Sequence, residues 1–309
     1  MYSRATLVRI MHSVFFVLVL TGTSHAFETE IQSITADAEF LSVAFSPDGA
    51  SIAVGDVEGG IRLYALPGGT EDLAFQGHDD AVTTLAFSPD GATLVSGSYD
   101  KTVKLWSMPD ATPARVLDNK YRIRAIAISP DGAMIAAGQS NDDVTVFDMA
   151  TGDTLHVLDD HRDPVYGLAY SPDGATLATG AKDRTIKLWD ARSGTLKTTL
   201  KRHKGGVRGV AFAADGTWFA SASDDKTVKL WDLKTMEVRA TLEGHDNRVL
   251  AVAISPDGRT VASGAQDDTA KLWDAGTGEL RATLTGFADP PSALAFSPDG
   301  SLLAAAAED

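Results

Sequence analysis

Four sets of histidine, serine or threonine, aspartate and tryptophan recur at fixed spacing along the chain. In each set the hydroxyl residue follows the histidine by 18 residues, the aspartate by 22 and the tryptophan by 28. Serine, histidine and aspartate are the residues of a hydrolase triad, in which the histidine activates the hydroxyl and the aspartate orients the histidine. The sets are His78, Ser96, Asp100 and Trp106; His161, Thr179, Asp183 and Trp189; His203, Ser221, Asp225 and Trp231; and His245, Ser263, Asp267 and Trp273.

Repetition argues against catalysis by these sets. A hydrolase needs one exposed nucleophile, whereas this pattern offers four internal copies. Polar groups that are buried together can satisfy one another's hydrogen bonds and stiffen the unit that holds them. The histidines lie in different copies and cannot converge on one ion, as a zinc site would require. We therefore predict no catalytic residue, no metal site and no cofactor, and expect that the chain is not an enzyme.

The element that positions these sets is a repeat marked by Ser-Pro-Asp-Gly or a close relative of it. The marks are spaced by 41 or 42 residues, a period typical of propellers and solenoids. The chain has no cysteine, so its stability must come from packing. The seven glycines of the marks are Gly49, Gly91, Gly132, Gly174, Gly216, Gly258 and Gly300.

The second repeat shows the strands that each unit builds. Residues 82–87 and 93–97 are apolar runs on either side of the Ser-Pro-Asp-Gly turn, residues 102–106 alternate, and residues 115–117 lead to the next repeat. Pro, Asp and Gly each favour a tight turn at these positions. The first strand is apolar on one face and carries alanine on the other, so we expect it to be enclosed at the crowded centre of the fold.

Leu-Trp or Leu-Trp-Asp closes the third strand in four repeats, at Trp106, Trp189, Trp231 and Trp273, and Gly-His precedes two of them. Together with the period, these residues resemble the WD40 repeat family. The resemblance covers the chain from about residue 27 onward. It implies an all-β, seven-bladed WD40 β-propeller of four-stranded blades, in which each His, Ser or Thr, Asp and Trp set is a structural tetrad.

Repeats one, three and seven lack the full tetrad. Tyr64 and Phe147 replace tryptophan, Ala53 or Ala137 stands near the hydroxyl position, and Phe287 replaces histidine. We expect these blades to rely more on apolar packing.

The seventh repeat stops at Asp309, which is equivalent to Asp100, so its third strand is missing and we predict an incomplete last blade. We interpret this end as a truncation. Residues 28–34 are placed to be the outer strand of the last blade, but with the third strand missing we expect them to move inward and pair with residues 302–307.

Residues 1–26 lie outside the repeat and read as a signal peptide, with the propeller at residues 27–309. Arg4 and Arg9 precede a short apolar run, and Ser24 and Ala26 are small residues at the positions that a signal peptidase reads. We predict an exported protein, periplasmic or secreted, with an uncleaved N-terminal membrane anchor as the alternative. No other segment is an integral membrane candidate.

The formal net charge of −15 argues against nucleic acid as the partner, because such binding depends on Lys and Arg at phosphates. The acidic pairs Asp142-Asp143 and Asp159-Asp160 lie in turn-like segments and are interpreted as solvated turn residues rather than calcium ligands.

In a propeller, the residue that begins each inner strand lines the entrance to the central channel. These positions differ from repeat to repeat and include two arginines and a tyrosine, types enriched in interface hot spots. The alternative is that each arginine pairs with a nearby carboxylate such as Asp163 or Asp246. The partner-binding candidates are Leu41, Thr83, Arg124, Tyr166, Arg208, Leu250 and Ser292.

The leading functional hypothesis is a non-catalytic scaffold that presents protein or peptide contacts on one propeller face. The first alternative is a small-ligand sensor or an enzyme that uses the central channel. The second is the propeller fragment of a longer regulatory protein.

Overall fold

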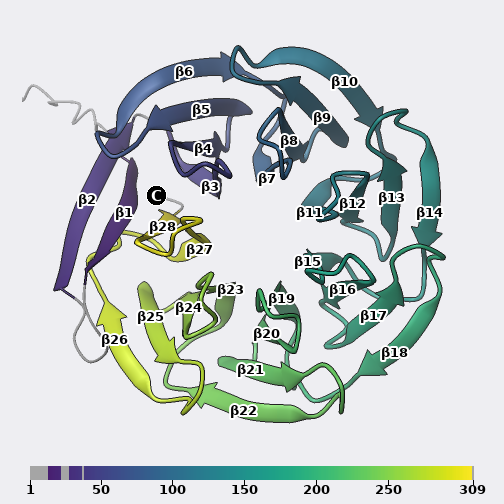
Figure 1. Ribbon diagram of the computed structural model, residues 1–309, viewed down its shortest axis with the longest axis vertical. Coiled ribbons are helices and arrows are strands. Elements are labelled where there is room, and N and C mark those ends of the chain that lie inside the picture. Colours follow the sequence, from purple (N-terminus) through teal and green to yellow (C-terminus); the bar gives the residue numbers. More distant parts are fainter. Residues whose placement is uncertain (1–12, 22–27, 37, 308–309) are drawn as a thin grey trace, which may run out of the picture.

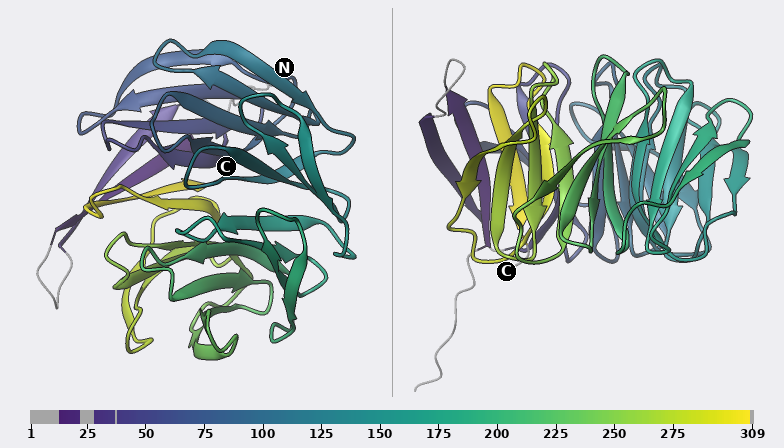
Figure 2. Two further views of the ribbon diagram at one scale, coloured as in Figure 1. Left: turned by 45° about the vertical axis from the view of Figure 1, so that its right-hand side comes forward. Right: turned by 90° about the horizontal axis from the view of Figure 1, so that it is seen from below.

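The computed structural model describes residues 13–21, 28–36 and 38–307, and every regular element in these ranges is a β-strand. The strands form small sheets arranged as a ring around a central channel (Figure 1). Seen from the side, the ring is a disc whose thickness is about one strand (Figure 2). No helix among the described residues is long and apolar enough to cross a membrane.

Six sheets each consist of four antiparallel strands that are consecutive in the chain. In each sheet the first strand lies at the channel and the fourth at the outer rim (Figure 1). The innermost strands are β3 (Phe40–Phe45), β7 (Val82–Phe87), β11 (Ile123–Ile128), β15 (Val165–Tyr170), β19 (Val207–Phe212) and β23 (Val249–Ile254). The second strands are β4 (Ser51–Asp56), β8 (Thr93–Ser98), β12 (Met134–Gln139), β16 (Thr176–Ala181), β20 (Trp218–Ser223) and β24 (Thr260–Ala265). The third strands are β5 (Gly60–Ala65), β9 (Thr102–Ser107), β13 (Val144–Asp148), β17 (Ile186–Asp190), β21 (Thr227–Asp232) and β25 (Thr269–Asp274). The outer strands are β6 (Thr70–Gln76), β10 (Thr112–Asp118), β14 (Thr154–Leu158), β18 (Leu196–Leu200), β22 (Val238–Glu243) and β26 (Leu280–Leu284).

The last repeat is different. The sequence predicted a seven-bladed propeller with an incomplete last blade; the incomplete blade is confirmed, but the count of seven is wrong for the blades that the repeats complete. The repeats build six complete blades, and the seventh contributes a two-strand fragment, β27 (Pro291–Phe296) and β28 (Leu302–Ala307). Two strands from outside the repeats lie beside this fragment, β1 (Ser13–Thr21) and β2 (Glu28–Ala36), in the order β2-β1-β28-β27.

The N-terminal segment thus occupies the place of the missing strand, but not as expected. β1 pairs with β28 in a register that sets Leu18 opposite Leu303, and β2 lies outside β1. The expected outer strand at residues 28–34 is confirmed as part of β2, whereas its inward pairing with residues 302–307 is wrong. The strand that pairs there comes from the apolar run of residues 13–21, and such a run suits a buried strand as well as a signal peptide.

The Ser-Pro-Asp-Gly marks are the turns between the first and second strands. In the second repeat Ser88 Oγ donates to Asp90 Oδ1 at 2.6 Å and accepts from the Thr93 amide at 2.9 Å. Gly91 has φ of +71°, a conformation that glycine adopts without strain. The local sequence therefore determines the turn, as predicted.

The apolar core lies between neighbouring blades. One cluster joins Ile61 and Leu63 of one blade to Leu94 and Trp106 of the next. Ala44 is the small residue of strand β3 and packs against the same cluster. The predicted enclosure of the alanine face holds only in part. Ala127 and Ala253 are buried, whereas the other five alanines are half-buried: Ala44, Ala86, Ala169, Ala211 and Ala295.

Candidate interaction surface at the channel mouth

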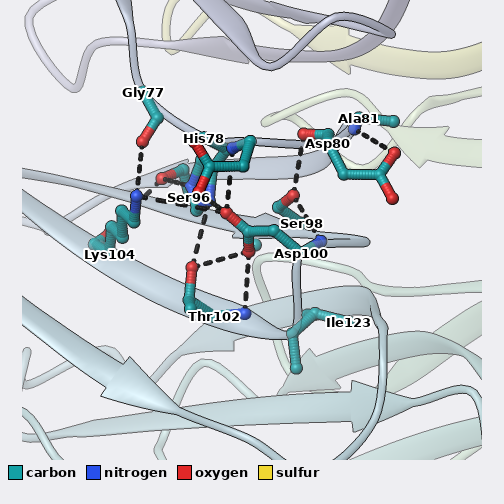
Figure 3. A network of polar contacts seen from close by, with 12 residues as sticks. Gly77, His78, Asp80, Ala81, Ser96, Ser98, Asp100, Thr102, Lys104 and Ile123 are labelled. Carbon is teal, nitrogen blue, oxygen red and sulfur yellow. Dashed lines mark hydrogen bonds and ion pairs between the residues drawn. The ribbon is translucent and has the colours of Figure 1, made fainter.

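The four predicted tetrads form inside their blades. In the second blade Asp100 Oδ2 lies 2.8 Å from His78 Nδ1, and Ser96 Oγ lies 2.7 Å from His78 Nε2 (Figure 3). The indole Nε1 of Trp106 donates to the same Ser96 Oγ at 2.9 Å. A neutral imidazole satisfies all three contacts if Nδ1–H donates to the carboxylate and Nε2 accepts from the hydroxyl. Each polar side chain of this tetrad therefore has a hydrogen-bond partner.

The other three tetrads repeat this geometry closely. In all of them the histidine contacts the aspartate at 2.8 to 2.9 Å and the hydroxyl at 2.7 to 2.8 Å. Their tryptophan indoles donate to the hydroxyl at 2.8 to 2.9 Å. Since the network recurs in four blades with nearly the same distances, it is a property of the repeat and not of one site.

A fifth member of the network escaped the sequence analysis. Thr102 Oγ1 donates to Asp100 Oδ1 at 2.7 Å, and the Thr102 amide donates to the same oxygen at 2.9 Å. A threonine two residues after each tetrad aspartate was the available signal. The equivalent residues in the other tetrad blades are Thr185, Thr227 and Thr269.

Burial and hydrogen bonding set the charges of these groups. Burial lowers the pKa of His78 and His245, and this effect outweighs the neighbouring carboxylates, which raise it. Burial raises the pKa of Asp183 and Asp225, but their hydrogen bonds from histidine and threonine outweigh it and hold both far below the usual range. The pKa values of Asp100 and Asp267, the partners of His78 and His245, are lowered as well, so these two tetrads combine a neutral histidine with an ionised aspartate at neutral pH.

The tetrad hydroxyls cannot act on a substrate from this position. Ser96 and His78 have 0% and 1% of their surface exposed, and the hydroxyl is already engaged by two partners. In this geometry each set is a buried hydrogen-bond network within its blade. The described residues also contain no group of three or more His, Asp or Glu arranged to hold a metal ion.

The blades without a tetrad replace it by packing. Tyr64 and Phe147 occupy the tryptophan positions and are buried in apolar clusters, and Ala137 occupies the hydroxyl position of its blade. In the first blade the residue in register with the hydroxyl is Val54, and Ala53 lies one residue earlier. Phe287 packs against the cluster beside the last fragment.

The seven partner-binding candidates converge at one end of the channel. All of them line a single cavity of about 300 Å³, together with Tyr99, Gln266 and Pro290. The structure therefore brings together the full predicted set, and the sequence analysis missed the three other lining residues.

A β-bulge presents each of these seven side chains. In strand β7 the ladder pairs Val82 with Ser98 and Thr84 with Gly97, so Thr83 is left between two paired residues. The same register shift occurs at each of the other six positions. A bulge bends the strand and redirects the extra side chain, here toward the channel. The bulges explain why these positions vary freely while the ladder around them is repeated.

Arginine and tyrosine side chains alternate across one half of the mouth. The Arg124 guanidinium lies 5.3 Å from the ring centroid of Tyr99 and 5.1 Å from that of Tyr166. The Arg208 guanidinium also contacts Tyr166, at 4.3 Å from its ring centroid. Arg122 covers Tyr99 at 5.1 Å. Contacts of a cation with an aromatic face stabilise such an arrangement.

The charges of these arginines are balanced unequally. Arg208 forms a bidentate ion pair with Asp224, with Nε to Oδ1 at 2.8 Å and Nη2 to Oδ2 at 3.0 Å. Burial lowers the pKa of Arg208, but the contacts with Asp224 outweigh it and raise the pKa. The sequence alternative of arginine–carboxylate pairing thus holds for Arg208, although its partner is neither Asp163 nor Asp246.

Arg124, in contrast, forms no ion pair with a carboxylate of the described residues. Its Nη1 donates to the Tyr99 hydroxyl at 3.1 Å, and it has no carboxylate within ion-pair distance among the described residues. In the same described part of the chain, the buried Nε of Arg124 and the buried Oγ of Ser292 have no hydrogen-bond partner. Buried polar groups are rarely left unpaired in this way.

Closed rings of four-stranded blades define the class of β-propellers, and the tetrads narrow that class. The family model described as WD domain, G-beta repeat matches residues 69–107, 112–148, 152–190, 194–232, 236–274 and 278–309. The chain belongs to the WD40 repeat family. No curated protein matches the sequence. The first match begins at residue 69, after the first three strands of the first blade, β3, β4 and β5. This blade is one of those without a tetrad.

Proposed function

We propose that this protein is a non-catalytic scaffold that binds a protein or peptide partner at the channel mouth. WD40 propellers typically serve as protein-interaction scaffolds, and the family is generally non-catalytic. The observation that carries the proposal for this chain is the convergence of seven bulged residues of different types on one cavity. Positions that vary inside a strict repeat, and that face an open cavity, suit the recognition of one particular partner.

The mouth is better suited to binding than to catalysis. Its lining residues include two arginines and two tyrosines but no histidine, aspartate or glutamate. General acid–base chemistry depends on such groups within reach of the substrate. The enzyme alternative would have to rely on Tyr99 and Tyr166, since no histidine or carboxylate lines the cavity.

A second cavity, of about 470 Å³, lies at the turns on the opposite face, beside Arg115 and Met149. Two of its polar residues, Ser88 and Asp90, already bond within their own Ser-Pro-Asp-Gly turn. Because this turn recurs in nearly every repeat, the cavity carries little that is particular to one partner. The face that carries these turns is therefore the reference surface for the experiment below.

A photoreactive amino acid placed at two positions tests the proposal. Leu250 represents the mouth, and Asp215 in the turn between β19 and β20 represents the opposite face. In cells that produce the full chain, crosslinked partners are expected from position 250 and not from position 215. Equal crosslinking at both positions, or crosslinking at position 215 alone, would contradict an interaction site at the mouth.

We propose further that the N-terminal segment directs export and that the ring closes as seven blades when β1 stays attached. The charged and apolar pattern of residues 1–26 supports export, and the pairing of β1 with β28 supports closure. The two proposals constrain each other, since cleavage after Ala26 would remove Ser13–Thr21 and leave β28 with an open edge. The mass of the protein recovered from the cell envelope would distinguish a cleaved from an intact N-terminus.

A further inference from the structure

We propose that the channel mouth recognises a carboxylate of its partner and that Arg124 is the residue that binds it. This inference rests on the proposed interaction function and specifies the chemistry of the contact. The carboxylate belongs to an aspartate or glutamate side chain or to a peptide C-terminus, which offer the same two oxygens.

The state of Arg124 is the first argument. Its guanidinium is held between the rings of Tyr99 and Tyr166, and one of its nitrogens is fixed by the Tyr99 hydroxyl. Its positive charge has no carboxylate partner among the described residues, and its buried Nε donates to no acceptor there. A guanidinium has five N–H donors in a fixed plane, a geometry that matches a carboxylate in two parallel hydrogen bonds.

Comparison with the neighbouring arginines makes Arg124 the specific choice. Arg208 is neutralised by the bidentate contact with Asp224, and Arg122 lies 3.9 Å from Asp80 at the exposed rim. Of these three arginines, Arg124 is the one whose charge is left for a ligand. Arg124 is half-buried beside the rings of Tyr99 and Tyr166, and an ionic contact is stronger at a partly buried site than in bulk water.

The other side of the mouth offers a second contact. Strand β27, which carries Ser292, lies across the channel from β11, which carries Arg124 (Figure 1). Ser292 Oγ is buried and has no hydrogen-bond partner in the described part of the chain. A hydroxyl can donate to a carboxylate oxygen or accept from a peptide amide, so a ligand that enters the mouth can engage both sides.

The volume of the cavity and the net charge of the protein limit which ligands can bind. The cavity of about 300 Å³ is at the small end of the range for ligand pockets, roughly 300–1,000 Å³, and suits one side chain or one chain end. The protein carries a net charge of −15, so a polyanion would be repelled by the surrounding surface. A single carboxylate on an otherwise neutral or basic peptide fits both conditions.

The test selects peptides that bind the full-length chain from two peptide libraries. One library has a randomised internal segment and an amidated C-terminus, and the other ends in a free carboxylate. Enrichment of Asp or Glu at one position of the first library would identify a side-chain carboxylate. Enrichment that requires the free end of the second library would identify the C-terminus, and either result supports the proposal.

Selected peptides are then measured against variants. Arg124→Gln should weaken binding roughly tenfold or more, and replacing the peptide carboxylate by an amide should weaken it by a similar factor. Arg124→Lys keeps the charge but loses the planar fork, so an intermediate loss is expected. Arg202→Gln is the matched control, because it removes the same charge from an exposed residue paired with Glu237, and it should change affinity less than twofold.

Each outcome is decisive. A carboxylate preference that persists in both Arg124→Gln and Arg124→Lys would overturn the role of Arg124. Selected peptides without any carboxylate requirement would overturn this inference and leave the proposed interaction function intact. If the wild-type protein enriches no peptide from either library, both the inference and the proposed function are contradicted.

Discussion

The interior of the blades and the mouth of the channel use polar residues in opposite ways. Inside four blades the same tetrad recurs, and its hydrogen-bond lengths differ by no more than about 0.1 Å between blades. At the mouth seven equivalent bulges carry five different residue types, and Arg124 and Ser292 keep buried polar atoms without partners in the described part of the chain. The repeated, fully satisfied network is part of the blade structure, whereas the varied mouth with its unpaired groups is the surface that we propose for a ligand.

Among substitutions of polar residues, the largest effect on stability should come from breaking one tetrad. Ser221→Ala removes the hydroxyl that contacts both Trp231 Nε1 and His203 Nε2, at 2.8 and 2.7 Å. Two buried groups lose a partner at roughly 1–3 kcal/mol each, so the free energy of unfolding should fall by roughly 2–4 kcal/mol in urea titrations. The exposed Ser193→Ala is the control, with a change within about 0.5 kcal/mol. Equal effects of the two variants would mean that the tetrad is dispensable.

Acid should weaken the blade interiors next. The folded pKa values of His78 and His245 lie below the ordinary value of 6.5, so the unfolded chain binds more protons than the folded one below that pH. Their contribution to stability is therefore fully present above about pH 6.5 and is lost as the pH falls through the lower folded pKa values. We expect the melting temperature to decrease between pH 7 and pH 5.

A double variant isolates the two histidines. His78→Gln with His245→Gln should be less stable than the wild type at pH 7, because glutamine reproduces the network poorly. It should also show a flatter decrease between pH 7 and pH 5, since glutamine does not titrate. A decrease as steep as in the wild type would assign the acid sensitivity to other groups.

Blades with and without a tetrad should differ in local opening. Amides of β12, in a blade that lacks the tetrad, should exchange about tenfold faster than those of β20, which corresponds to roughly 1.4 kcal/mol of local stability. Strands β12 and β20 hold equivalent places in their sheets, so the comparison is matched for depth. Uniform protection in hydrogen-exchange mass spectrometry would show that packing around Phe147 compensates fully for the missing network.

The smallest effect on stability should come from the mouth. Leu250→Ala truncates a half-buried residue on a bulge and should change the free energy of unfolding by no more than about 0.5 kcal/mol. Leu272→Ala makes the same truncation in the same blade, at a fully buried position, and should cost roughly 2–5 kcal/mol. Similar losses for both variants would place Leu250 in the core rather than on a binding surface.

The local pattern of the sequence predicted much of this architecture. The period located the turns, the tetrads and the positions that line the mouth, because these depend on residues within one repeat. The threonine partner of each tetrad aspartate, such as Thr102, was missed although its spacing is regular. The bulges were missed because a register shift depends on the partner strand and leaves no residue type of its own.

Long-range pairing was the hardest part to predict. Strand β1 pairs with β28, with Phe16 opposite Ala305, and no local periodicity links these distant segments. The apolar run of residues 13–21 was interpreted as part of a signal peptide, whereas in the structure it is the third strand of the last sheet, between β28 and β2. The state of Arg124 was likewise hidden, since its lack of a carboxylate partner depends on side chains from neighbouring blades.

Hydrogen exchange of the full chain with a bound selected peptide tests the central claim most directly. If the mouth is the interaction surface, the peptide should slow exchange at the starts of β11, β15 and β19 and in the loop that carries Tyr99. The Ser-Pro-Asp-Gly turns on the opposite face should keep their exchange rates. Protection confined to those turns or to the outer strands would contradict the account.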